Sequence, residues 1–137
     1  MRTIDKIIIH CSATPEGRAV TVEEIDRWHK ERGFDSIGYH YVIYLDGSIH
    51  PGRPIEKVGA HCVNQNKNSI GICYIGGLTK DGKIPKDTRT DAQRKTIRSL
   101  IAELKVQYPT ATVHGHCEFA AKACPCFNVV EEYAEKI

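Results

Sequence analysis

Histidine and cysteine side chains that could hold a metal ion occur near both ends of the sequence. His10 follows the apolar run Ile7-Ile8-Ile9, and a second group combines His114 and His116 with the segment Lys122-Ala-Cys-Pro-Cys126. Zinc accepts imidazole nitrogen and thiolate sulfur, and a catalytic zinc takes three protein ligands and leaves a fourth position to water. The two groups therefore predict a zinc site of the hydrolytic type.

The choice of the three ligands follows from where the residues stand in the predicted elements. His10 and His116 lie at the ends of two predicted strands, which could bring both imidazoles into one cleft. The third ligand is expected from the next loop. Cys124 is favoured there, because the proline after it restricts its backbone and so directs its thiol. Cys126 and Cys117 remain possible substitutes.

Two other interpretations fit the same residues. His10 could be a hydrogen-bonded histidine at a strand end, with the cysteines acting as small buried hydrophobic residues. A structural zinc site could instead use Cys117, Cys124 and Cys126, although these lack the spacing of two to four residues that is typical of a zinc knuckle. The spacing alone leaves all three interpretations open.

The elements that must position these residues alternate between strands and helices. Strands are predicted at 4–10, at 39–45 with a hairpin through Asp46-Gly47 to about Ile49, at 69–75 and at 112–116. Residues 51–68 lack periodicity and are expected to form a long surface loop, which is often functional in a compact domain.

Capping signals and helical spacing predict three helices. One begins at Thr21 with a capping box and ends near Gly33, and one follows Thr90 with apolar residues at helical spacing from Ile97 to Tyr108. A closing helix is expected from Asn128. The pattern predicts an α/β fold, a central mixed β-sheet flanked by helices, in one domain over residues 1–137.

The composition is that of an ordinary soluble globular protein, with 41% hydrophobic and 26% charged residues. A net charge of +2 is too small to indicate nucleic-acid binding. No apolar run approaches the ~20 residues of a membrane helix, and no signal peptide is recognised. We expect synthesis in the cytoplasm, no membrane insertion and a monomer, with the six cysteines free or metal-bound.

A series of short motifs occurs in a defined order between about Ile4 and Phe127. The motifs are His10-Cys-Ser-Ala-Thr14, Trp28-His29-Lys30, Gly38-Tyr39-His40-Tyr41, Asp46-Gly47, Gly52-Arg53, Val58-Gly59-Ala60-His61, Asn68-Ser-Ile-Gly-Ile72, Gly76-Gly77 and Lys122-Ala-Cys-Pro125. In this order the chain closely resembles the type-2 N-acetylmuramoyl-L-alanine amidases, a family that includes a phage amidase called a lysozyme and the animal peptidoglycan recognition proteins.

The resemblance implies a ligand set for the metal. It makes His10, His116 and Cys124 the zinc ligands. His116 takes precedence over His114 because the family's ligand aligns with the histidine six positions before Lys122. Two neutral imidazoles and one thiolate leave a net positive charge on the zinc complex, which suits the activation of water and the polarisation of a carbonyl.

The resemblance also makes Tyr39 and Lys122 the catalytic side chains beside the metal. Lys122 stands two residues before Cys124, so both side chains share one side of an extended segment, and the ammonium could face charge that develops in the transition state. The Tyr39 phenol could orient the attacking water or relay a proton. No glutamate stands in a His-Glu-x-x-His motif, and Glu118 is expected to make ordinary surface or ligand-supporting hydrogen bonds.

The implied reaction is hydrolysis of the amide between the lactyl group of N-acetylmuramic acid and L-alanine in peptidoglycan. Such a substrate needs an open groove, and Arg53, His61 and Asn68 lie in or beside the long loop, where they could bind it. The chain would then act on the cell wall, as a phage or prophage endolysin or a wall-remodelling enzyme, after release or export by another factor.

Two alternatives keep the fold and change the function. One is a binding module that holds peptidoglycan without cutting it, although Cys124 counts against it because such proteins typically lack the thiolate ligand. The other is a regulatory protein with a protein partner such as a phage RNA polymerase. Retention of both predicted catalytic side chains favours the enzyme.

Three residues depart from the family pattern near the predicted metal. Asn128 stands where the family often has aspartate, which could alter the support of the site. Cys126 replaces a small Gly or Ser, and Cys117 replaces a polar residue next to His116. The extra thiols make oxidation or a different ligand set possible.

Overall fold

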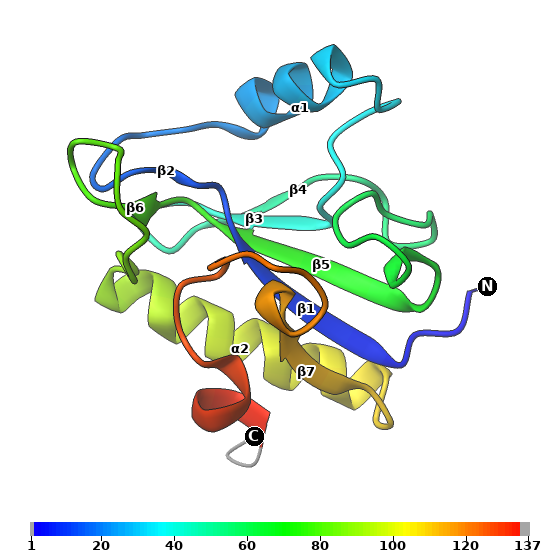
Figure 1. Ribbon diagram of the computed structural model, residues 1–137. Helices are drawn as coiled ribbons and strands as arrows, with labels where there is room; N and C mark the ends of the chain where they lie inside the picture. The colour runs from blue at the N-terminus through cyan, green and yellow to red at the C-terminus, as the bar shows by residue number, and fades with distance from the viewer. Residues whose placement is uncertain (1, 135–137) are drawn as a thin grey trace.

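The computed structural model describes residues 2–134 and consists of a five-stranded sheet with a helix over each face (Figure 1). The strands are β1 (Lys6–Cys11), β3 (Tyr41–Ile43), β4 (Ile49–Pro51), β5 (Ser69–Tyr74) and β7 (Thr112–Gly115), in the spatial order β4-β3-β5-β1-β7. Only β4 runs antiparallel to its neighbour, so the predicted α/β fold with a central mixed sheet is confirmed. A separate parallel pair joins β2 (Thr14–Pro15) to β6 (Gly77–Leu78).

The central strand β1 is buried on both faces, as its continuous run of isoleucines predicts. Ile7 and Ile9 belong to the larger core cluster, which also contains the apolar residues of the long helix α2 (Asp91–Gln107). Because side chains alternate along a strand, Ile8 and His10 point to the opposite face. His10 is only 1% exposed. The alternation of β1 therefore turns this histidine away from the main core.

Helix α1 (Val22–Glu31) lies over the face of the sheet toward which His10 points (Figure 1). Its predicted capping box is present, with the Glu24 N–H donating to Thr21 Oγ1 at 3.2 Å and the Thr21 N–H donating to Glu24 Oε1 at 3.3 Å. Ile25 and His29 form its buried face. The cap fixes where the helix begins, and so which turn presents His29.

Helix α2 covers the other face and begins with a second capping box, formed by Thr90 and Gln93. Its buried stripe agrees with the predicted spacing and consists of Gln93, Ile97, Leu100, Ile101 and Leu104. The buried Gln93 amide donates to the carbonyls of Ile43 and Ile75, at 3.3 and 3.0 Å. The helix is therefore hydrogen-bonded to the sheet edge as well as packed on it.

The predicted strand at 39–45 is shorter than expected. Only Tyr41–Ile43 pairs as a strand, and Tyr39 and Leu45 pack with Val42 on the α1 side of the sheet. In a continuous strand over 39–45, Tyr39 would share a face with Tyr41 and Ile43. It does not, because strand alternation does not extend beyond β3. The departure turns the Tyr39 ring toward His10, 5.1 Å away between ring centroids.

The predicted closing helix is a single π-helical turn, Val130–Ala134. Its start agrees with the capping signal, since Asn128 Oδ1 accepts from the Glu131 N–H at 3.0 Å.

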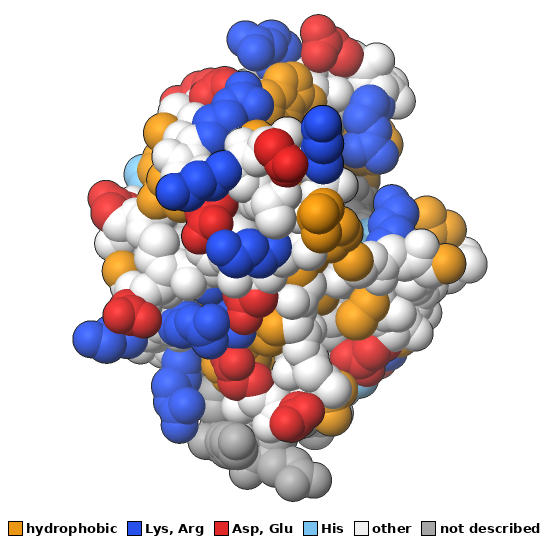
Figure 2. Space-filling model, turned by 60° about the vertical axis from the view of Figure 1, so that its left-hand side comes forward, with side chains coloured by type: hydrophobic (Ala, Val, Ile, Leu, Met, Phe, Trp, Pro, Cys, Tyr) orange, Lys and Arg blue, Asp and Glu red, His pale blue; other side chains and the backbone are white. Residues whose placement is uncertain are grey.

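Among residues 2–134, no helix combines the length and the apolar character needed to cross a membrane. On the face shown in Figure 2, basic and acidic side chains are interspersed, so this face carries charge of both signs.

Candidate active site

Three side chains from distant segments converge at one end of β1. The ligating atoms of His10, His116 and Cys124 all lie within 4.8 Å of one another. Ile9 pairs with Gly115 across the parallel strands β1 and β7, so the residues that follow them are neighbours. The two imidazole centroids are 4.6 Å apart. Sheet register therefore sets the two histidines side by side, although His116 itself begins the 3-10 turn His116–Glu118 rather than ending the strand.

The Cys124 thiol is held against β1. The Cys11 N–H donates to Cys124 Sγ at 3.2 Å, and the same sulfur lies 4.0 Å from His10 Nδ1. On the other side, the Cys117 N–H donates to the Cys124 carbonyl at 2.8 Å. These contacts place the thiol between the two histidine-bearing segments.

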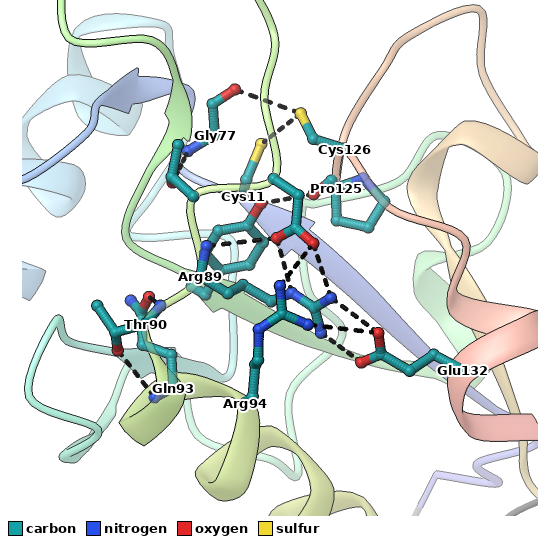
Figure 3. Close-up of polar contacts among 12 residues, drawn as sticks. Cys11, Gly77, Arg89, Thr90, Gln93, Arg94, Pro125, Cys126 and Glu132 are labelled. Atoms are coloured by element: carbon teal, nitrogen blue, oxygen red, sulfur yellow. Dashed lines mark hydrogen bonds and ion pairs between the residues drawn. The ribbon is translucent and has the colours of Figure 1, made fainter.

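The segment after Cys124 is anchored to the protein core by hydrogen bonds (Figure 3). The buried Tyr74 hydroxyl donates to the Pro125 carbonyl at 2.6 Å, and Cys126 Sγ donates to the Gly77 carbonyl at 3.3 Å. Tyr74 is the last residue of β5, and Gly77 is the first residue of β6. The position of the thiol is therefore set by the core rather than by its own loop.

A buried arginine links the same segment to the end of the chain that the structure describes. Arg89, whose side chain is 1% exposed, lies with its guanidinium carbon 3.3 Å from the Phe127 ring centroid. It pairs with Asp87 at 2.9 Å and with Glu132 at 2.5 Å (Figure 3). Hydrogen bonds from Arg89 lower the pKa of the Glu132 carboxyl. Because the guanidinium is buried and paired with two carboxylates, it fixes the geometry of the segment around Phe127.

His10 is supported by a hydrogen-bonded chain of buried groups. His10 Nε2 lies 2.8 Å from His61 Nδ1, and His61 Nε2 lies 3.2 Å from Ser69 Oγ. His61 is 8% exposed and Ser69 is fully buried. Because Nε2 of His10 faces His61, its Nδ1 is left free to face Cys124.

Two glycines make room for the His61 ring. A Cβ at Gly71 would lie 2.7 Å from two atoms of the imidazole, and a Cβ at Gly59 would lie 2.7 Å from the same ring. Real Cβ atoms do not approach this closely, so any larger residue at either position would displace His61. The motif residues Gly59 and Gly71 thus leave the space that the His61 ring occupies.

Two adjoining hollows of about 230 and 280 Å³ open beside the convergent side chains. Residues common to both are His29, Arg32, Tyr39, His116 and Lys122. Cys124 lines the first hollow, and His61 lines the second. Two predicted ligands, His116 and Cys124, therefore line one cleft with both predicted catalytic side chains. The third predicted ligand, His10, is buried and lines neither hollow.

Burial raises the pKa of the Tyr39 phenol well above its usual value, so the hydroxyl is protonated at neutral pH and can donate. His29 also lines both hollows, although it was not among the predicted site residues. Its Nδ1 accepts from the Gly38 N–H at 2.9 Å, so the neutral ring carries its proton on Nε2. The Trp28-His29-Lys30 motif was the signal that could have marked it.

Two predicted substrate contacts lie apart from this cleft. The Arg53 guanidinium donates to the carbonyls of Ser36, Ile37 and Val58 at 2.8–3.1 Å, which braces the long loop. Asn68 donates to the Thr3 carbonyl at 2.9 Å. It precedes Ser69, which pairs with Lys6 at the far end of β1 from His10. Neither residue lines the two hollows, whereas His61 does.

Two buried histidines outside the convergent group predict a loss of stability in acid. Burial lowers the pKa of His29 and of His40 to about 4, from an ordinary value of 6.5. Both rings are therefore neutral in the folded protein, and their contribution is complete above pH 6.5 and is lost as pH falls toward 4. Each should cost about 2 kcal/mol of unfolding free energy at about pH 5.

Urea unfolding near neutral pH and near pH 5, with a chelator present throughout, measures this effect. We expect a clearly lower midpoint in acid for the natural protein and a smaller difference between the two conditions for His40→Gln. His114→Gln is the matched control, because the His114 side chain contacts Thr112, Glu118 and Phe119 near the surface and should leave the difference unchanged. Equal midpoints in the natural protein would contradict the burial argument.

The chain is similar to known proteins in both sequence and fold. Residues 1–127 match the family described as N-acetylmuramoyl-L-alanine amidase. An endolysin of Klebsiella phage KP32 is 44% identical over 124 residues, which cover 90% of this chain and 82% of the relative. The solved amidase LysC from Clostridium intestinale superposes with a TM-score of 0.80 at 28% identity, covering 96% and 82% of the two chains.

A recognition protein has the same fold. A mutant of Drosophila PGRP-LB, solved in complex with tracheal cytotoxin, gives a TM-score of 0.79 at 25% identity and covers 99% of this chain and 83% of that chain. The family match spans nearly all of the chain and includes every residue of the cleft. The chain therefore belongs to the N-acetylmuramoyl-L-alanine amidase family and is an enzyme of that class.

Proposed function

We propose that the chain is a zinc-dependent amidase that cleaves the bond between the lactyl group of N-acetylmuramic acid and L-alanine in peptidoglycan. The single observation that carries this proposal is the convergence of His10, His116 and Cys124 within 4.8 Å, beside a cleft that His116 and Cys124 line together with Tyr39 and Lys122. The similarity to phage endolysins supports action on the cell wall.

The three side chains fit zinc in number and in type. Two imidazoles and one thiolate are donors that zinc prefers, and three protein ligands are typical of its catalytic sites. Zinc lies about 2.0–2.1 Å from nitrogen and 2.3 Å from sulfur, so ligating atoms several ångström apart suit one ion. A zinc ion held there would supply Lewis-acid activation of water and of the scissile carbonyl.

The protein's own groups then handle binding and charge. Lys122 is exposed at the mouth of the cleft and carries an ammonium that can donate to the carbonyl oxygen as negative charge develops on it. The protonated Tyr39 hydroxyl belongs to a ring whose centroid lies 5.1 Å from that of His10, and it can hold the attacking water or the amide in line. His29, on α1, offers a further N–H donor to a peptide carbonyl of the substrate.

His61 was predicted to bind substrate, and its contacts support a positioning role through His10. If His10 holds the ion through Nδ1, its Nε2 carries a proton and donates to His61 Nδ1, while His61 Nε2–H donates to Ser69 Oγ. We expect His61→Ala to weaken zinc binding by about 10–100-fold, because this hydrogen bond orients the ligand. Competition with a chromogenic chelator measures the change.

Asparagine provides the matched control at the same position. Its side-chain oxygen can accept where Nδ1 accepts, so His61→Asn should bind zinc nearly as tightly as the natural protein. If His61→Ala instead keeps its zinc affinity and raises KM alone, His61 is a substrate contact and the positioning role is wrong.

Digestion of purified peptidoglycan tests the proposed function directly. With zinc present, the protein should release new L-alanine amino termini without new reducing sugar ends. A chelator should stop the release, and zinc added afterwards should restore it. Protein that sediments with peptidoglycan but releases no amino termini would be a binding module. Release that persists through exhaustive chelation would refute zinc dependence.

A further inference from the structure

The structure brings together two cysteines that the amidase chemistry does not use. Cys11 Sγ and Cys126 Sγ lie 4.0 Å apart, close to van der Waals contact, although 115 positions separate them in the sequence (Figure 3). Cys117, the other extra thiol expected near the metal, is exposed on the surface. The partner of Cys126 is therefore Cys11.

Packing holds both members of this pair in place. Cys11 is 5% exposed, and a Cβ at Gly77 would lie 2.5 Å from its sulfur, so only glycine leaves room for the thiol. Cys126 has a φ of +73°, a left-handed conformation that is uncommon for a residue with a side chain. Its sulfur also contacts the Gly77 carbonyl. The surroundings thus impose a backbone conformation that keeps the second thiol against the first.

The pair joins the two segments that build the metal centre. Cys11 follows His10 on β1 and faces the main core, because neighbouring residues of a strand point to opposite faces. Cys126 stands two positions after Cys124 in the anchored segment. A bond between the sulfurs would tie the strand that carries one predicted ligand to the segment that carries another, without using a ligand.

We propose that Cys11 and Cys126 are a redox-active thiol pair. Small disulfides, such as glutathione disulfide, oxidise this pair to a disulfide bond. Such a bond forms in oxidising surroundings, whereas the two cysteines stay reduced in the cytoplasm. The inference stands apart from the proposed function, since neither thiol belongs to the proposed zinc ligands.

The chemistry proceeds by two exchanges. Cys126, the more exposed thiol, loses its proton and attacks one sulfur of glutathione disulfide, which forms a mixed disulfide and releases one glutathione. The Cys11 sulfur loses its proton and attacks the Cys126 sulfur, which forms the protein disulfide and releases the second glutathione. The two cysteines lose two protons and two electrons, and the small disulfide becomes two thiols.

The experiment uses zinc-loaded protein with Cys117→Ser as the parent, because exposed Cys117 would itself take up glutathione. After incubation with glutathione disulfide, the unfolded protein should show two fewer titratable thiols, and mass spectrometry should find Cys11 linked to Cys126. The closed loop spans most of the chain, so the thermal midpoint should rise by roughly 5–15 °C. The reductant dithiothreitol should reverse both changes.

Single substitutions separate the two exchanges. Adding Cys126→Ser should leave every remaining thiol intact, whereas adding Cys11→Ser should trap glutathione on Cys126, since the second nucleophile is gone. The proposal is overturned if the parent keeps all its thiols, if the linked peptide joins another pair, or if the Cys126→Ser protein loses as many thiols as the parent.

Discussion

Replacing Cys124 by alanine is expected to abolish both zinc retention and amidase activity. As a zinc ligand, Cys124 would supply the only negative charge of the convergent group, and the two imidazoles alone would leave the ion with two protein ligands. We expect zinc affinity to fall by more than the 10–100-fold typical of a lost outer partner. The value of kcat/KM should fall by at least about 10³-fold, because a zinc ion held at this site would activate both water and the scissile carbonyl. Metal analysis after dialysis and release of L-alanine amino termini measure the two effects.

The matched control is Cys117→Ala, which removes a neighbouring exposed thiol. Cys117 contacts Cys124 only through its backbone N–H, so its side chain can change without moving the ligand. Zinc content and rate should match those of the natural protein. If Cys124→Ala keeps a stoichiometric ion and Cys117→Ala loses it, the ligand set is wrong. Circular dichroism of the Cys124→Ala protein excludes unfolding as the cause.

The buried central strand and the meeting of the two predicted ligand histidines could be predicted, because both follow from local patterns at the strand ends. The apolar run Ile7-Ile8-Ile9 marks a strand covered on both faces, and the residues that follow two parallel strands meet at one edge of the sheet. Capping boxes at Thr21 and Thr90 likewise locate helix starts from four residues. Patterns of this kind depend on neighbours in sequence, so they can be recognised without knowledge of the tertiary structure.

Contacts made by residues without periodic surroundings could not be predicted. His61 lies in a loop whose sequence fixes no spacing, so its hydrogen bond to His10 follows only from the folded path of residues 51–68. Tyr39 precedes β3, so the alternation of side chains along the strand does not determine its direction. Cys126 contacts Cys11 because Gly77 has no side chain to occupy the space. The two ion pairs of Arg89, with Asp87 and with Glu132, also depend on segments far apart in the chain. Family motifs indicated several of these residues, but not what they contact.

Replacing Lys122 by alanine is expected to separate metal binding from turnover. The side chain is exposed and is not part of the convergent ligand group, so zinc content should be unchanged. If its ammonium faces the carbonyl oxygen only as charge develops, its loss should lower kcat by about 10²–10³-fold and leave KM nearly constant. Steady-state kinetics on a soluble muramyl peptide, with metal analysis of the same sample, measures the separation.

Two further substitutions identify the part that charge plays. Lys122→Arg keeps a positive donor near the oxygen and should recover part of the lost rate, whereas Lys122→Met keeps the length without charge and should stay as slow as alanine. A higher KM at constant kcat would instead mean that Lys122 binds the ground state, for example a carboxylate of the stem peptide. If Lys122→Met turns over as fast as the natural protein, the ammonium has no role in the transition state, and the protonated Tyr39 hydroxyl becomes the remaining donor beside His10.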